Sequence, residues 1–294
     1  MTVRYSFRTE VVGILLGDVL ADVAIRVWEP EGSELSVLCV HGFAGNGQDF
    51  EILAETLVKS GMTVIAPDII GRGQSSFLGA DQAYTLRNYI ACISAAARFV
   101  KGKVCHLGTS WGGIVLLGYL ATTGWRSQGL ILNDIPLSSD ANLENFRALL
   151  REEAIKSFGT REEAGEYVIS SRSLDFLSEA HKKRLIDSRV MALGDSWRMR
   201  YDPAVAAPFS NSGTFSVVQT LQILHMPTLM TFGTHSPYVS NPELDLIART
   251  NPNVAVLRDL DDPHPPSLMK ISQILQVAGF LSQCFGASGP LAQV

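Results

Sequence analysis

Features that mark several large classes of protein are scarce in this sequence. The 294 residues carry a formal net charge of −5 without a basic cluster or stripe, which argues against a nucleic-acid-binding surface. No apolar run approaches the ~20 residues that span a bilayer, and the N-terminus lacks the charged and apolar segments of a secretory signal. We therefore expect a small-molecule substrate as partner, and neither nucleic acid nor membrane.

Cysteine is also rare, and no two cysteines have the CxxC spacing of a zinc or redox site. The four are Cys39, Cys92, Cys105 and Cys284. Two of them lie in apolar, strand-like runs, where a small buried thiol is typical. We expect a reduced, cytoplasmic protein. The sequence has no HExxH motif and no carboxylates paired with histidine, so we expect no metal and no cofactor.

What the sequence does contain is an alternation of strand and helix patterns. At 46% hydrophobic and 18% charged residues, the chain can bury a substantial core. Apolar runs of strand length alternate with helical patterns, the strands at residues 23–28, 35–40, 62–66, 104–107, 130–132, 228–232 and 254–257. This order predicts an α/β fold with a mostly parallel, doubly wound sheet covered on both faces.

The alternation stops between residues 136 and 220. This stretch shows charged helical patterns at 143–154, 161–169 and 178–187, and no convincing core strand. It is too long for a plain loop. We therefore predict a helical cap over the carboxyl edge of the sheet, where open α/β folds bind ligands. The predicted core is then residues 1–135 and 221–294, with the cap at 136–220.

A G-x-S-x-G pattern follows the strand at 104–107 and precedes a helix. It reads Gly108-Thr109-Ser110-Trp111-Gly112-Gly113. Strand before and helix after is the context of a nucleophile elbow, in which glycines permit a tight turn that exposes the serine hydroxyl. A plain connecting turn or a phosphate-binding loop are the alternatives, but the Walker lysine and the G-x-G-x-x-G pattern are both absent. We therefore predict that Ser110 is a nucleophile.

With this elbow, the chain resembles the α/β-hydrolase superfamily over nearly its whole length. The motifs that carry the resemblance occur in the family's order: His41-Gly42-Phe43, Pro67-Asp68-Ile69-Ile70-Gly71-Arg72-Gly73-Gln74-Ser75, Gly108-Thr109-Ser110-Trp111-Gly112-Gly113, Leu132-Asn133-Asp134 and Asp262-Pro263-His264-Pro265-Pro266. The resemblance implies the α/β-hydrolase fold with a helical cap inserted after the sixth strand. It does not select a substrate, because esterases, carbon–carbon bond hydrolases, lactonases and cofactor-free haloperoxidases share these motifs.

A serine nucleophile needs a base, and the resemblance points to His264, which follows the last strand in a proline-rich loop. His235, in the loop after the strand at 228–232, is its main rival. The other histidines have ordinary explanations: His41 as a structural residue of the oxyanion loop, His106 in a strand, His181 on a cap helix and His225 at the surface.

The acid of the triad departs from the family pattern. Most members carry aspartate after the strand at 228–232, but this chain has Pro237 there, which has no carboxylate. Asp134, at the end of the strand at 130–132, is the best substitute, since some members of the superfamily place the acid there. It could instead cap the start of the cap segment. Asp261 and Asp262 are further alternatives, whereas Asp68 is expected to brace the loop at 71–73.

The resemblance assigns the oxyanion hole to the backbone N–H groups of Phe43 and Trp111. Their side chains, together with the cap aromatics Trp197 and Tyr201, are expected to bind the substrate. The cap aromatics, Phe209 among them, could equally form the cap's own core. No group of basic residues near the motifs suggests a strongly anionic substrate, although Arg72 and Arg198 are left open.

Together these patterns predict a serine hydrolase that cleaves a carboxylic ester or related acyl bond of a small, largely apolar substrate. Ser110 attacks, His264 transfers the proton and Asp134 orients His264. Two alternatives stay open: a carbon–carbon bond hydrolase or lyase on the same scaffold, and a ligand-binding member of the fold without turnover. A homodimer is also left open.

Overall fold

The computed structural model describes residues 3–79, 84–124, 126–137, 140–206, 217–234, 236–237, 239–260, 262 and 264–286. An eight-stranded sheet runs through the middle of the molecule, in the order β1-β2-β4-β3-β5-β6-β9-β10. Its strands are β1 (Tyr5–Leu16), β2 (Val19–Pro30), β3 (Leu35–Val40), β4 (Thr63–Pro67), β5 (Lys103–Thr109), β6 (Leu130–Asn133), β9 (Thr228–Gly233) and β10 (Val254–Leu260). From β4 to β10 every neighbouring pair is parallel, so the prediction of a mostly parallel sheet is confirmed.

The strand β1 was missed by the sequence analysis. It pairs antiparallel with β2 along its whole length, and residues Gly17 and Asp18 form the turn between them. Gly17 has a φ of 62°, a conformation that glycine adopts at little cost. Two strand-like runs separated by Gly-Asp are a hairpin signal, so the sequence did contain the information for this edge of the sheet.

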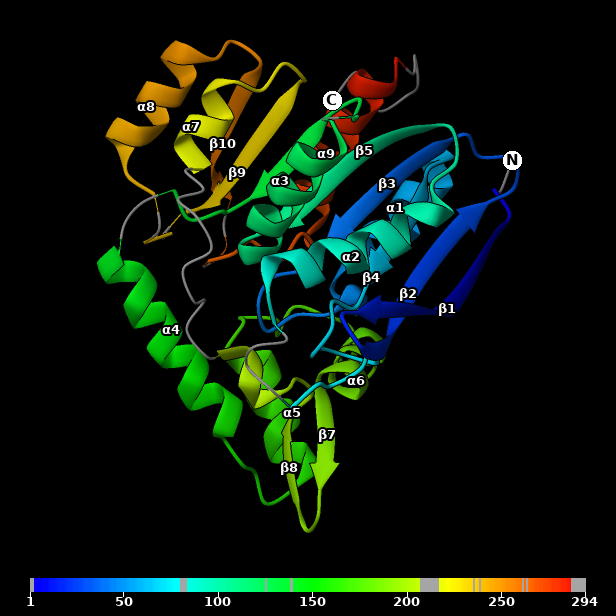
Figure 1. Ribbon diagram of the computed structural model, residues 1–294, viewed down its shortest axis with the longest axis vertical. Coiled ribbons are helices and arrows are strands. Elements are labelled where there is room, and N and C mark those ends of the chain that lie inside the picture. Colours follow the sequence, from blue (N-terminus) through cyan, green and yellow to red (C-terminus); the bar gives the residue numbers. More distant parts are fainter. Residues whose placement is uncertain are drawn as a thin grey trace.

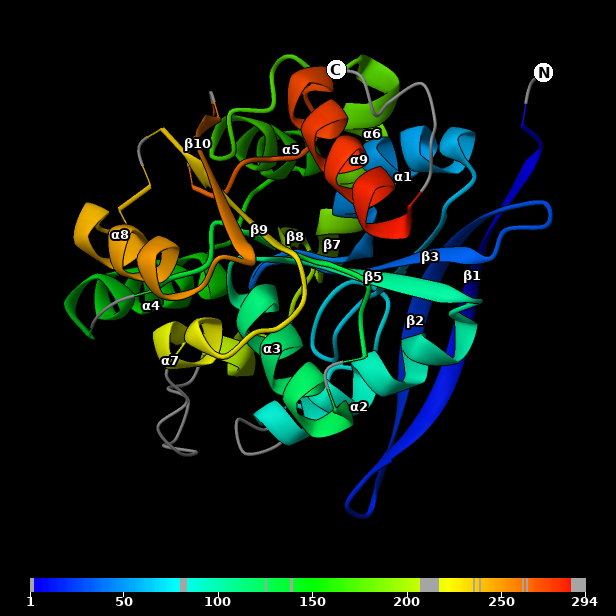
Figure 2. The ribbon, with the colours of Figure 1, turned by 90° about the horizontal axis from the view of Figure 1, so that it is seen from above.

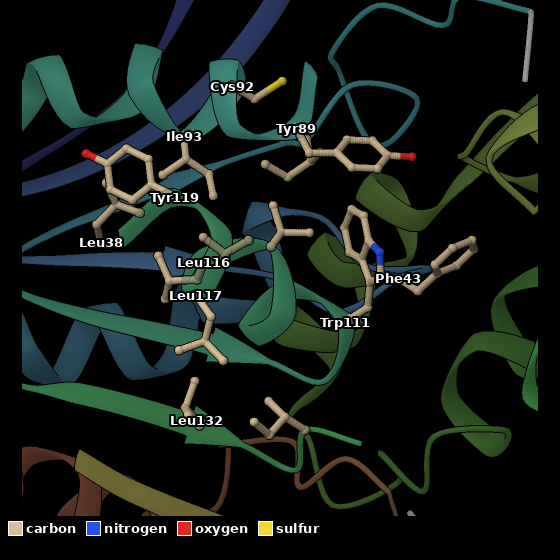
Figure 3. Close-up of a cluster of buried hydrophobic side chains, with 14 of the residues drawn as sticks. Leu38, Phe43, Tyr89, Cys92, Ile93, Trp111, Leu116, Leu117, Tyr119 and Leu132 are labelled. Atoms are coloured by element: carbon tan, nitrogen blue, oxygen red, sulfur yellow. The ribbon is translucent and has the colours of Figure 1, made fainter. Parts of the chain in front are cut away.

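Helices cover both faces of the sheet (Figure 2). The helices are α1 (Glu51–Leu57), α2 (Leu86–Ala96), α3 (Trp111–Thr123), α7 (Val217–Gln222), α8 (Asn241–Thr250) and α9 (Ile271–Phe285). Side chains of α1 and α9 pack with one face, and those of α2, α3, α7 and α8 with the other. Figure 3 shows part of the cluster formed with α2 and α3, where Leu116 and Leu117 of α3 lie between α2 and the strands. The two-sided covering explains why the central strands are apolar on both faces.

The described part of the chain between β6 and α7 lies beyond the carboxyl ends of the parallel strands (Figure 1). It contains α4 (Asp140–Ile155), α5 (Arg161–Ser170) and α6 (Glu179–Arg189), so the three helices predicted there are confirmed. A hairpin of β7 (Val190–Leu193) and β8 (Ser196–Met199) follows, which the sequence did not suggest. This hairpin is a separate two-stranded sheet and does not extend the main one.

Among the described residues, no helix combines the length and the apolar character needed to cross a membrane. Parallel pairing brings the carboxyl ends of β3, β5, β6, β9 and β10 to one edge of the sheet. The loops that follow β5, β6 and β10 carry Ser110, Asp134 and His264.

Candidate active site

Ser110 stands in a strained turn between β5 and α3. Its φ is 50° and its ψ is −124°, which is unusual for a residue with a side chain. The neighbouring glycines are required by space: a Cβ on Gly112 would lie 2.2 Å from the carbonyl oxygen of His41, and one on Gly108 would lie 2.5 Å from Cα of Gly113. The N–H of Ser110 donates to the carbonyl of Asn133 on β6 (2.7 Å). This is the geometry of a nucleophile elbow.

His264 faces the hydroxyl of Ser110. Ser110 Oγ and His264 Nε2 lie 3.1 Å apart, within hydrogen-bond distance. The loop that carries His264, between β10 and α9, is tied to β6, because Asn133 Nδ2 donates to the carbonyl of Pro266 (2.9 Å). The imidazole is therefore positioned to accept a proton from Ser110.

Asp134 lies on the other side of the imidazole. Its Oδ1 is 3.1 Å from His264 Nδ1, and its side chain is fully buried. Ser236 Oγ donates to Oδ1 (2.5 Å), and the N–H of Gly233 donates to Oδ2 (3.2 Å). The two donors lie at the end of β9 and in the segment after it, the region where most of the family carries the acid. In this chain that region supplies hydrogen bonds to the carboxylate of Asp134, which directly follows the neighbouring strand β6.

Asp262 has a different role from Asp134. Its carboxylate accepts hydrogen bonds from the N–H and hydroxyl of Ser267 (2.9 and 2.8 Å) and from Gln273 Nε2 (3.0 Å). It also pairs with Lys270 Nζ at 3.1 Å. Burial alone would raise the pKa of Asp262, but these donors outweigh burial and lower it. Asp262 thus braces the loop of His264. The alternative acid Asp261 lies outside the described residues.

Of the remaining histidines, His41, His106 and His181 have structural positions, and His225 is exposed, as predicted. His41 is buried, with Nδ1 2.7 Å from the carbonyl of Gly42 and Nε2 accepting from the N–H of Ile69 (3.0 Å). Burial lowers the pKa of His41 to about 3 and that of His106 to about 4, so both rings are neutral near neutrality. His181 lies on α6, with Nδ1 2.8 Å from Ser178 Oγ. The predicted rival, His235, lies outside the described residues.

Asp68 braces the loop after β4, as predicted. Its carboxylate forms a buried ion pair with Arg26. It also accepts from the N–H groups of Gly47 (2.7 Å) and Gln74 (2.8 Å). These contacts satisfy the carboxylate far from His264, so Asp68 is no candidate for the acid.

The loop after β3 lies beside the elbow. A Cβ placed on Gly42 would be 3.9 Å from Cβ of Ser110. The rings of Phe43 and Trp111 meet edge to face, with their centroids 5.7 Å apart. The two segments predicted to supply oxyanion-hole N–H groups are therefore neighbours at the nucleophile. The hydrogen bonds to an oxyanion stay a prediction.

A cavity of about 430 Å³ opens above Ser110 and His264. One wall is the loop after β3, including Phe43, and the opposite wall comes from the segment between β6 and α7. Of the predicted substrate-binding side chains, Phe43 is among the lining residues, whereas Trp111, Trp197 and Tyr201 are not.

Those three side chains have other partners. Trp111 packs against Tyr89, with ring centroids 4.8 Å apart. Tyr201 is buried, and its hydroxyl donates to Glu153 (3.1 Å). The backbone of Trp197 bridges to Phe158. The cavity therefore gives no support to the prediction that these three residues bind the substrate. Phe209 lies outside the described residues.

Charged side chains line the far wall, which the sequence analysis missed. Arg172 pairs with Glu153 (2.9 Å), and Arg189 pairs with Asp49 (2.6 Å). Lys156 also lines the cavity, with Nζ 4.3 Å from the centre of the Tyr167 ring. The two basic residues left open from the sequence, Arg72 and Arg198, are not among the lining residues. No local motif marks this wall, because its residues come together only through folding.

One group in the described chain has the composition of a metal site. Glu51 and Glu55 on α1 approach His181 on α6. Arg184 already occupies this place, since its guanidinium lies 2.8 Å from Glu51 and 3.7 Å from Glu55. The group is therefore a network of ion pairs between the two helices.

Known proteins resemble this chain over most of its length. A family model described as alpha/beta hydrolase fold matches residues 36–270. The 3-hydroxybutyrate-oligomer hydrolase of Cupriavidus necator is 24% identical over 86% of this chain and 90% of that protein. The proline iminopeptidase of Lactobacillus delbrueckii is 27% identical over 67% of this chain and 73% of its own. The structure of an alpha/beta hydrolase from Novosphingobium aromaticivorans matches with a TM-score of 0.77 and 22% identity, covering 94% of this chain and 98% of the other.

Proposed function

The chain belongs to the alpha/beta hydrolase family, and we propose that it is a serine hydrolase that cleaves a carboxylic ester or related acyl bond of a small substrate. The observation that supports the proposal is the position of His264 between two side chains. Its Nε2 lies 3.1 Å from Ser110 Oγ, and its Nδ1 lies 3.1 Å from Asp134 Oδ1. The described residues between β6 and α7 are the proposed cap, and side chains between Leu149 and Arg189 form one wall of the cavity.

The geometry supports acyl transfer in two steps, formation of an acyl-enzyme and its hydrolysis. Ser110 Oγ attacks the carbonyl carbon while His264 Nε2 accepts the hydroxyl proton, and Asp134 stabilises the imidazolium that forms. The N–H groups of Phe43 and Trp111 stabilise the negative charge on the tetrahedral oxygen. His264 returns the proton to the departing alcohol, which leaves an ester on Ser110. Water, deprotonated by His264, then releases the acid and restores the hydroxyl.

The cavity supports a substrate with a polar end. The scissile bond lies next to Ser110 and Phe43, whereas the far wall carries the ion pairs of Arg172 and Arg189 and the ammonium of Lys156. A largely apolar substrate would leave the ammonium of Lys156, which has no carboxylate partner in the described chain, without a polar partner. We therefore propose short esters of polar acids, the class to which an oligomer of 3-hydroxybutyrate belongs.

Turnover assays with the purified chain test this proposal. The panel is p-nitrophenyl acetate, p-nitrophenyl octanoate, a linear 3-hydroxybutyrate dimer, L-prolyl p-nitroanilide and a β-diketone, each with Ser110→Ala as control. We expect hydrolysis of the acetate and of the dimer, faster than of the octanoate, and no turnover by the variant.

Other results would redirect the proposal. Cleavage of the β-diketone with no ester hydrolysis would favour the carbon–carbon bond hydrolase. Turnover of the prolyl anilide alone would favour a peptidase. A folded wild-type protein that turns over none of the panel, and whose Ser110 does not react with a fluorophosphonate, would favour the ligand-binding alternative.

A further inference from the structure

Arg72 is fully buried directly behind the candidate site. A guanidinium removed from water normally pairs with a carboxylate, because an uncompensated buried charge is costly. Arg72 instead donates from Nε to the carbonyl of Phe43 (2.9 Å) and from Nη1 to the carbonyl of Ile70 (3.0 Å). In the part of the chain that the structure describes, it forms no ion pair. Among those residues, the hydrogen bonds of its guanidinium go to backbone carbonyls and not to a carboxylate.

Three aromatic rings surround this charge. Cζ of Arg72 lies 4.8 Å from the centre of the Phe43 ring, 4.5 Å from that of Trp111 and 5.2 Å from that of Tyr89. Figure 3 shows these three rings grouped at the end of the buried cluster. Aromatic faces attract a cation, so the rings explain how the guanidinium is tolerated. They also fix its position.

The partners of Arg72 include both residues predicted to supply the oxyanion hole. Phe43 belongs to the loop after β3, and Trp111 begins α3. These two segments are distant in sequence, and one guanidinium contacts a side chain from each while it also holds the carbonyl of Phe43. Loss of Arg72 would free the loop of Phe43 to rotate away from Trp111.

Arg72 is itself held from two sides. Its N–H donates to the carbonyl of Ile69 (3.1 Å). Its backbone also bridges to Tyr201, and the N–H of Asp202 donates to the carbonyl of Gly71 (2.8 Å). The sequence motif around Arg72 therefore connects the core, the oxyanion loop and the segment that covers the cavity.

We propose that Arg72 is a positioning residue for the oxyanion hole, which holds the loop of Phe43 against the start of α3 and places its guanidinium behind it. This rests on the proposed function. Negative charge grows on the substrate oxygen only in the transition state, so the contribution of Arg72 is expected in kcat and not in substrate binding.

The test compares Arg72→Met and Arg72→Lys with Arg98→Met, an exposed arginine on the core surface. For each variant we would measure kcat, KM, the inhibition constant of a trifluoromethyl ketone that forms a tetrahedral adduct, and the fraction of protein that a fluorophosphonate can titrate. We expect Arg72→Met to lower kcat by about ten- to a hundredfold per titrated site, somewhat less than loss of a direct donor, with KM within about twofold. The ketone should weaken by the same factor as kcat/KM. Arg72→Lys, which keeps the charge but not the planar fork, should recover part of kcat.

Two results would overturn the inference while leaving the proposed function intact. One is unchanged kcat and ketone inhibition in Arg72→Met. The other is a loss in both Arg72 variants that disappears when rates are divided by the titrated fraction, which would mean a purely structural role. If Arg72→Met does not fold, Arg72→Lys decides alone by the same two criteria. A wild-type protein without turnover or titratable serine would overturn the proposed function and, with it, this inference.

Discussion

The two walls of the cavity are built in different ways. The core wall consists of strand-end loops in which Ser110 and Asp134 have positive φ values and are almost fully buried. The cap wall carries charged side chains from helices and from the turns that follow them, such as Arg172, which pairs with Glu153. Strand ends hold the reacting groups within the tolerance that acyl transfer needs. The long charged side chains of the cap can be substituted without moving those groups. The difference indicates that the core determines the chemistry and the cap determines the substrate.

The largest expected effect is on the core wall. Ser110→Ala removes the nucleophile, and we expect kcat to fall by on the order of 10⁶, as in the best-studied serine protease. KM and the melting temperature should change little, because a hydroxyl is replaced by hydrogen in an unchanged turn. Steady-state kinetics and calorimetry on the same preparation measure this. Retention of substantial activity would remove Ser110 from the mechanism.

The next largest effect distinguishes the roles of two buried aspartates of the core, Asp134 and Asp262. Asp134→Asn should lower kcat by on the order of 10⁴, because the amide favours the wrong imidazole tautomer. Asp262→Asn should instead lower the free energy of unfolding, by about 1–3 kcal/mol, since its oxygens accept from Ser267 and Gln273. Kinetics and urea denaturation of both variants distinguish the roles. The reverse outcome, with activity lost only in Asp262→Asn, would contradict the assignment of the acid.

A third prediction concerns acid stability. His41 and His106 are buried in the core, and burial lowers their pKa values from 6.5 to about 3 and about 4. Below pH 6.5 the unfolded chain therefore binds protons that the folded chain does not. Between pH 6.5 and the folded-state pKa of each histidine, the free energy of unfolding should fall by about 1.4 kcal/mol per histidine for each pH unit.

Urea denaturation at about pH 7.5 and about pH 5 measures this loss. His106→Asn should reduce it. An equal loss in wild type and His106→Asn would show that His106 already binds its proton in the folded state.

The smallest effect is expected on the cap wall. Lys156 has no carboxylate partner in the described chain, and its ammonium lies over the Tyr167 ring at the cavity. Lys156→Met should raise KM about tenfold for an ester with a carboxylate at its far end, the size of one charge-assisted hydrogen bond. For a neutral ester KM should not change. Lys103→Met, at the opposite end of β5 from Ser110, is the control. A fall in kcat for both esters would contradict the division between the walls.

The core wall of the site could be predicted from the sequence, whereas the cap wall could not. Ser110, His264 and Asp134 lie in short motifs whose strand and loop contexts are local, and the structure brings these three side chains together. The charged cap wall could not be predicted, because Lys156 and Arg172 become neighbours of the site only when the helices pack over the sheet. Buried aromatic residues such as Tyr201 were placed in the pocket for the same reason, since composition does not tell which face of a cap element is inside.

The strand β1 is a different kind of omission. Its turn signal at Gly17 and Asp18 was present in the sequence. At the edge of the sheet it has one partner strand, and apolar side chains such as Phe7 and Val11 remain exposed there, so its pattern is not that of a buried strand. Apolar runs alone predicted the central strands and not this one.

Activation of Ser110 by His264 can be measured by mass spectrometry of the intact chain after treatment with a fluorophosphonate. We expect one adduct per chain, mapped to Ser110, that forms much more slowly in His264→Ala and at the wild-type rate in Asp262→Asn. An adduct on another residue, or labelling of Ser110 at an unchanged rate in His264→Ala, would contradict it.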